Sequence, residues 1–176
     1  MVTEQKKTLQ ALQTAIQMEI DGKEFYRKAS QKSNNEMGKE LLKQLAEEED
    51  IHRQKFEEIY EAMRDRKAWL KIDYHPDGGR RLRTIFARAT EEIGAAAKVL
   101  STELDAVQTA INMESKTYDF YKAQSKKTTH DVTRDFYEAL ATQEREHQLV
   151  LLDYHEYLKD PAGWFVSKEH PSLDGG

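Results

Sequence analysis

The chain has 176 residues, a formal net charge of −5 and no cysteine. The length supports one domain or two very small ones, and the lack of cysteine excludes disulfides, thiol nucleophiles, zinc ribbons and iron centres held by thiolates. The acidic balance argues against nucleic acid as the main partner. No apolar run approaches the roughly 20 residues that cross a bilayer, and none near the N-terminus is typical of a signal peptide. We therefore expect a soluble cytoplasmic protein with no membrane partner.

Long helices dominate the expected secondary structure, because the chain contains only 8 glycines and 3 prolines. Apolar residues recur at three- and four-residue steps and predict four long helices, over residues 4–33, about 35–70, about 102–127 and about 129–159. Capping boxes are expected where Ser33 precedes Glu36 and where Thr128 precedes Asp131.

The connections between these helices predict the architecture. Helices of this length extend about 45 Å and bury their stripes only by packing side by side. The first two helices and the last two are joined by short links, whereas residues 71–100 form a long crossover with a turn signal at 71–79 and a short amphipathic helix at about 84–100. Two hairpins with one long crossover predict an all-α protein, the ferritin-like variant of the four-helix bundle.

The expected domain organisation follows from this arrangement. Residues 1–160 form the bundle, with a first repeat at about 4–70, the crossover at 71–100 and a second repeat at about 101–160. Pro161 and Gly163 end the last helix, and residues 161–176 are expected to form an extended or irregular tail.

An internal duplication relates the two hairpins at an offset of 95 residues. The segment Ala-Ile-Gln-Met-Glu at 15–19 matches Ala-Ile-Asn-Met-Glu at 110–114, and further identities follow along both hairpins. The duplication also selects among neighbouring acids. In the run 47–50, only Glu49 keeps a carboxylate in the second copy, where it matches Glu144.

Six acidic and imidazole side chains fall inside the apolar stripes of the four long helices: Glu19, Glu49, His52, Glu114, Glu144 and His147. A buried carboxylate without a partner is costly, so four of them converging on one core require cations. Glutamate and histidine three residues apart lie on the same side of a helix and can share a metal. A glutamate on two helices and Glu-x-x-His on two others is the pattern of di-iron and di-manganese bundles.

Two tyrosines lie on the faces that carry these acids. Tyr26 and Tyr121 each follow a stripe glutamate, Glu19 or Glu114, by seven residues. They are either ordinary core aromatics or donors of hydrogen bonds that orient the ligand carboxylates.

The crossover is basic. Residues 64–88 carry eight arginines and lysines against three aspartates. We interpret this excess as a solvated connection, with an anion site or a partner surface as the alternative.

The motifs at 15–26, 45–52, 110–121 and 140–147 resemble the rubrerythrin-like branch of the ferritin-like superfamily. The resemblance covers most of residues 8–171, and the chain's end resembles members that lack a rubredoxin domain. It implies a di-iron centre in which Glu19 and His52 hold one iron and Glu114 and His147 the other. Glu49 and Glu144 would bridge both irons.

The same resemblance implies an activity and its partners. Members reduce hydrogen peroxide or dioxygen, or oxidise and hold Fe(II). Rubrerythrins proper carry an additional glutamate where this chain has Thr117, which matches Gly22 in the first repeat. Without cysteine, electrons must come from another protein or from Fe(II) itself.

Three functions therefore remain open: a di-iron oxidoreductase acting on peroxide or dioxygen, an iron-handling ferroxidase, and a metal-binding bundle without turnover. The residues by themselves do not separate iron from manganese, since both accept an oxygen-rich shell. Trp164 and Phe165 follow the last helix, and an exposed aromatic pair needs cover. We expect this aromatic pair to dock on a second chain and form a homodimer. The alternative is that the pair folds back onto its own bundle.

Overall fold

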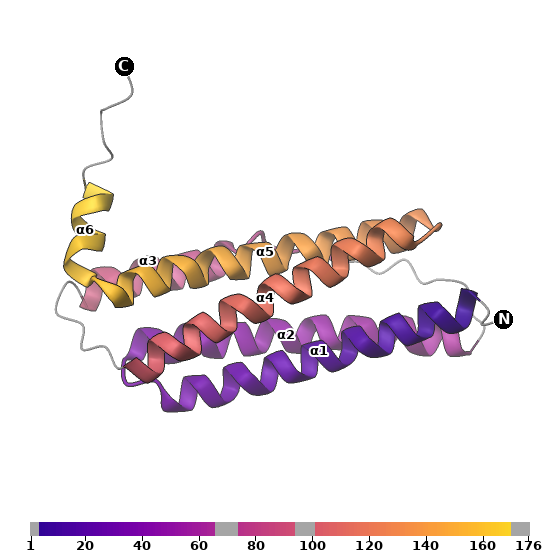
Figure 1. Ribbon diagram of the computed structural model, residues 1–176, viewed down its shortest axis with the longest axis horizontal. Helices are drawn as coiled ribbons and strands as arrows, with labels where there is room; N and C mark the ends of the chain where they lie inside the picture. Colours follow the sequence, from indigo (N-terminus) through magenta and orange to yellow (C-terminus); the bar gives the residue numbers. More distant parts are fainter. Residues whose placement is uncertain (1–3, 66–73, 94–100, 170–176) are drawn as a thin grey trace, which may run out of the picture.

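A computed structural model describes residues 4–65, 74–93 and 101–169 of the chain. These residues form six helices: α1 (Glu4–Lys32), α2 (Glu36–Arg64), α3 (Arg80–Ile93), α4 (Ser101–Lys127), α5 (Asp131–Lys159) and α6 (Pro161–Glu169). Helices α1 and α2 form one antiparallel hairpin, and α4 and α5 form the other (Figure 1). The all-α, ferritin-like bundle of two hairpins is thus confirmed. The expected ends of the second and short helices, at 66–70 and 94–100, lie outside the described residues.

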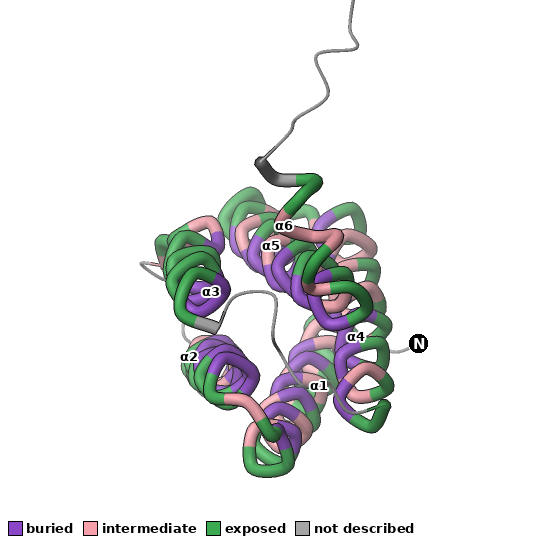
Figure 2. Tube along the Cα trace, turned by 90° about the vertical axis from the view of Figure 1, so that its left-hand side faces the viewer, coloured by how far each residue is buried: buried purple, intermediate pink, exposed green. Residues whose placement is uncertain are grey.

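Helix α3 makes the crossover part of the bundle wall. It packs against α2 and α5 and lies between them when the bundle is seen end on (Figure 2). The helix begins at Arg80, four residues before the expected start. Asp77 explains the difference, because its carboxylate accepts hydrogen bonds from the backbone N–H groups of Gly79 (2.7 Å) and Arg81 (3.0 Å). Gly78 and Gly79 supply the positive φ angles, 65° and 70°, that the preceding turn needs.

The apolar core is divided into two clusters along the bundle. One contains Leu45, Ile111 and Leu151 together with the buried face of α3. The other contains Leu12 and Phe56 among its members. In each long helix the sequence passes from one cluster to the other through a short polar stretch, so the bundle has a polar middle between two apolar ends.

The two expected capping boxes are wrong in detail. The residue that caps α2 is Asn35, whose Oδ1 accepts from Gly38 N–H at 2.6 Å. Ser33 instead donates its hydroxyl hydrogen to Glu103 of α4 at 2.6 Å. At the start of α5, Thr128 Oγ1 accepts from the backbone N–H of His130 at 3.3 Å. Ser33 thus makes a tertiary contact and Thr128 a local turn, instead of the capping bonds that their spacing predicted.

The expected irregular tail is also wrong over residues 161–169, which form α6. Proline suits the first position of a helix because its missing N–H is not needed there, and Asp160 Oδ1 accepts from Gly163 N–H at 3.0 Å. The indole ring of Trp164 stands edge-on to Phe86 (5.5 Å between centroids) and Tyr157 (5.7 Å). The aromatic pair therefore covers its own bundle, which removes the reason for expecting a homodimer; dimerisation itself stays a prediction.

Within the described ranges, every helix is too short or too polar to cross a bilayer. Two arginines of α3 pair with acids of the bundle: Arg83 with Glu146, and Arg88 with Glu40. Both pairs lie at the surface of the bundle. The basic residues Arg66, Lys67 and Lys71 lie outside the described residues, so the solvated connection stays a prediction.

Gly38 provides a test of the packing that fixes the first hairpin. A Cβ at this position would overlap three polar atoms, Ser33 Oγ, Glu103 Oε1 and Tyr154 Oη. Helix propensity alone predicts that Gly38→Ala stabilises the protein by about 1 kcal/mol. We expect the opposite sign, a loss of roughly 1–3 kcal/mol in the free energy of unfolding, because the added methyl group would overpack the turn. Urea unfolding measures the change, with the exposed Lys43→Ala as control; a stabilised Gly38→Ala would contradict the packing.

Candidate metal centre

The polar middle of the bundle holds all six predicted site residues. They come from the four long helices, and each is at most 3% exposed: Glu19 of α1, Glu49 and His52 of α2, Glu114 of α4, and Glu144 and His147 of α5. Neighbouring turns on both sides belong to the two apolar clusters. The 3.6-residue repeat places each side chain on the inward face of its helix.

The six residues form two overlapping groups. Glu19, Glu49, His52 and Glu144 make one group, and Glu49, Glu114, Glu144 and His147 make the other. In each group, one ligand atom from every residue lies within 4.8 Å of the others. Glu49 and Glu144 belong to both groups, as expected for residues between two metals.

Both histidines direct Nδ1 toward the carboxylates. His52 Nδ1 lies 3.0 Å from Glu144 Oε1 and 3.4 Å from Glu19 Oε2. His147 Nδ1 lies 3.2 Å from Glu49 Oε1 and 3.6 Å from Glu114 Oε2. The two rings are parallel within 10°, with centroids 5.7 Å apart.

The unsatisfied atoms of the site test whether a metal would fit. Within the described part of the chain, six inward-facing atoms make no hydrogen bond: Glu19 Oε2, Glu49 Oε1, both carboxylate oxygens of Glu144, and Nδ1 of His52 and His147. Leaving a buried polar atom unpaired costs roughly 1–3 kcal/mol. Carboxylate oxygens and imidazole nitrogens are ligands of iron and manganese, so the donor set fits two divalent cations.

Without a cation, protons must offset the buried charge. Burial and the neighbouring carboxylates raise the pKa of Glu49 and of Glu144 well above the ordinary value. Burial alone would lower the pKa of His147, but Glu114 and the other facing carboxylates outweigh it and raise that pKa well above its usual range. The pKa of His52 is raised in the same way, against burial, by Glu19 and Glu49. The site therefore favours added positive charge.

The two tyrosines donate hydrogen bonds across the repeats. Tyr26 of the first hairpin donates to Glu114 Oε1, and Tyr121 of the second donates to Glu19 Oε1. Burial and these carboxylates raise the pKa of both phenols well above the usual range, so they stay protonated donors. Each glutamate thus has one oxygen fixed by a tyrosine and the other directed to the centre.

Sequence reasoning missed three residues beside the site. Glu48, set aside because its repeat counterpart is Gln143, is buried, and its Oε2 lies 2.8 Å from His147 Nε2. Burial works to raise the pKa of Glu48, but the hydrogen bond and charge of His147 lower it to about 2. Gln143 donates to the same Glu48 oxygen at 2.7 Å, and Tyr74 of the crossover bonds His52. The available signal was that Glu48 and Gln143 are both polar and directly precede the paired glutamates.

Gly22 lies directly against the centre. A Cβ at this position would stand 2.8 Å from Glu49 Oε2. Its repeat counterpart, Thr117, uses its hydroxyl to bond the backbone oxygen of Met113. Neither position supplies a further carboxylate, in agreement with the sequence.

The two hairpins enclose two glutamates that belong to both groups (Glu49 and Glu144), two that belong to one group each (Glu19 and Glu114), and two histidines. This arrangement indicates a ferritin-like bundle with a di-metal site. The family model of rubrerythrin matches residues 10–155 and 105–171, and the chain belongs to the rubrerythrin family. Comparison with curated proteins and with solved structures gave no match. Family and cluster together favour iron as the metal.

The metal-free protein should lose stability as the pH rises. Glu49, Glu144, His52 and His147 have raised pKa values, so the folded state binds more protons than the unfolded chain from about pH 5 upward. The pKa values of Glu48 and Glu114 are lowered by His147 against the effect of burial, and they act the other way only as the pH falls below about 4.5, the ordinary value. We expect a higher Tm near pH 5.5 than near pH 8.5 after chelation.

Metal should weaken this dependence, because bound cations take the place of the protons. Calorimetry with and without chelator measures both effects. Glu49→Gln, which carries no charge to lose, should flatten the metal-free profile. Identical melting curves with and without metal at both pH values would contradict a shared cation site.

Proposed function

We propose that the chain is a di-iron oxidoreductase that reduces hydrogen peroxide or dioxygen. The observation that carries the proposal is the convergence of six unsatisfied, buried ligand atoms in two groups that share Glu49 and Glu144. Glu19 and His52 would hold one iron, and Glu114 and His147 the other. Two irons bound by these residues would supply Lewis acidity and electrons for the reduction of an O–O bond.

The chain's own residues supply positioning and exclusion of water. Tyr26 holds Glu114 in place and Tyr121 holds Glu19. The two apolar clusters close the site on either side along the bundle. Because all six side chains are at most 3% exposed, the centre suits a diatomic or peroxide substrate better than a bulky organic one.

The electrons must reach this buried site from outside it. Reducing peroxide to water consumes two electrons and two protons, and the chain has no cysteine for a thiolate-held electron carrier. We therefore propose an external electron-donor protein as the partner.

A ferroxidase is the alternative that the residues also support. The additional carboxylate of rubrerythrins proper is absent at Thr117 and Gly22, and Fe(II) could act as its own reductant. Steady-state peroxide consumption with an added reductase supports the oxidoreductase. Mineral cores with many irons per chain and no such turnover would favour the ferroxidase.

Single replacements test the ligand assignment. Purified protein loaded anaerobically with Fe(II) should bind two ions per chain. His52→Ala and His147→Ala should each weaken one ion and leave the other held, whereas Glu49→Gln should weaken both because its carboxylate faces both groups. Each of these three variants should lose most of its peroxide turnover, since the proposed reaction needs both metals.

Elemental analysis and turnover are measured together, with His155→Ala on the same helix as His147 as the control. One ion or none in the unmodified protein would overturn the assignment. So would a His52→Ala protein that keeps both ions and full activity.

A further inference from the structure

The outward nitrogens of the two site histidines meet different partners. The repeat gives both rings an inward Nδ1, yet His147 Nε2 lies 2.8 Å from the carboxylate of Glu48. His52 Nε2 lies 2.8 Å from the phenol oxygen of Tyr74. The duplication therefore does not extend to the atoms that hold the histidines.

The packing of Glu48 against Gln143 explains the broken symmetry. These two residues are equivalent in the repeat, and the Gln143 amide donates to Glu48 Oε2 at 2.7 Å. A glutamate at 143 would place a second carboxylate against the first in a buried site, which is strongly unfavourable. One copy can carry the acid and the other an amide, so only one histidine obtains a carboxylate partner from the repeat.

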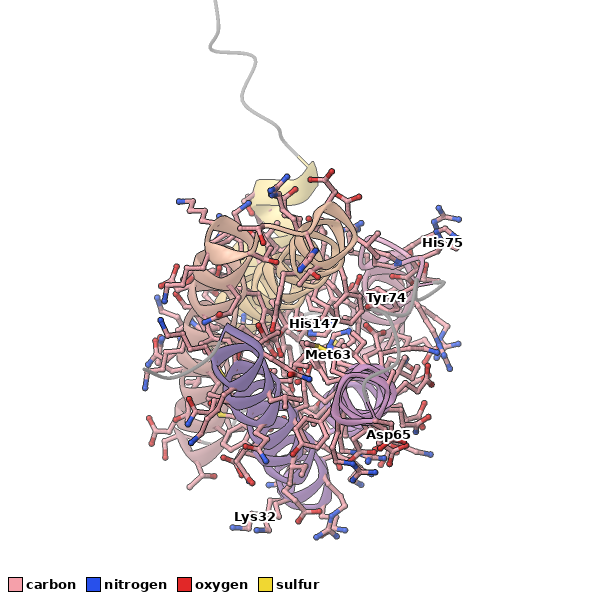
Figure 3. All side chains as sticks on the ribbon, turned by 90° about the vertical axis from the view of Figure 1, so that its right-hand side faces the viewer. Lys32, Met63, Asp65, Tyr74, His75 and His147 are labelled. Carbon is pink, nitrogen blue, oxygen red and sulfur yellow. The ribbon has the colours of Figure 1, made fainter. Side chains whose placement is uncertain are left out.

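The partner of the other histidine comes from outside both repeats. Tyr74 belongs to the crossover, just before α3, and its ring stands edge-on to His52 (5.8 Å) and Phe136 (6.1 Å). Figure 3 shows Tyr74 toward the middle of the bundle and the adjacent His75 at its periphery. Tyr74 thus brings a side chain of the crossover to the centre.

The two partners differ in what they do to an imidazole. A neutral histidine that presents Nδ1 to a metal carries its proton on Nε2, a tautomer assigned here from the hydrogen-bond network. A carboxylate that accepts this proton makes the ring a stronger ligand, and the bond is charge-assisted. A neutral phenol oxygen fixes the ring orientation without adding that charge.

We infer that Tyr74 is the positioning residue of His52 and Glu48 that of His147, so that the two metal positions are inequivalent. The position of Glu114 and His147 binds the tighter ion. The position of Glu19 and His52 fills second and depends on the crossover. This inference rests on the proposed di-metal site and goes beyond its ligand list.

Anaerobic Co(II) binding, followed by visible absorption and by competition with a chelator, tests the inference on the full chain. The unmodified protein should show a tight and a weaker step. Tyr74→Phe keeps the ring but leaves the His52 Nε2–H without its acceptor. It should weaken the second step by roughly 10–100-fold and leave the first unchanged.

Glu48→Gln should lower the Co(II) affinity of the first step by a similar factor, so that the affinities of the two steps become similar. Tyr118→Phe, at a partly buried tyrosine packed on the same apolar cluster as Tyr74, is the matched control and should change neither step. Melting of the metal-free variants is recorded in parallel. A Tyr74→Phe protein that only melts lower, with the isotherm of the control, overturns the positioning role.

The outcomes separate the two levels of proposal. If the unmodified chain binds fewer than two Co(II) ions, the proposed di-metal function fails. If it binds two with indistinguishable affinity, the site stands and the inequivalence is wrong.

Discussion

Buried negative charge is the constraint on which the rest of this structure depends. Four carboxylates that meet in a dry core repel one another, and water cannot screen them. Only positive charge, as protons or as metal ions, makes the folded bundle favourable at that point. The two apolar clusters lie on either side of this polar middle, and the burial of their side chains offsets the unfavourable burial of charge.

The hydrogen bonds around the centre tie the two hairpins into one unit. Tyr26 and Tyr121 each reach across to a glutamate of the other repeat, and Glu48 reaches from α2 to a histidine of α5. Neither hairpin carries a complete group of ligand atoms by itself. Assembly of the bundle and assembly of the site are therefore the same event, which is how metal binding can contribute to folding free energy.

The sequence was sufficient for the bundle and for the six central residues because both follow from periodicity. A glutamate in an apolar stripe, repeated at a fixed offset, is a strong signal, and the structure brings all six together. Local spacing failed where a tertiary contact competes for a side chain, as when Ser33 bonds Glu103 rather than capping α2. Tyr74 could not be found, since its role arises from where the crossover folds. Glu48 was missed because comparing the copies discards residues that differ between them.

The pairing of Glu48 with Gln143 has an evolutionary consequence. A symmetric dimer of one hairpin would place the same residue at both positions, and therefore two acids or two amides side by side. Fusion of the hairpins into one polypeptide frees the two copies to mutate separately. A hydrogen bond between a glutamate and a glutamine at these equivalent positions therefore requires two copies that have diverged, and the duplication allowed the two halves to specialise.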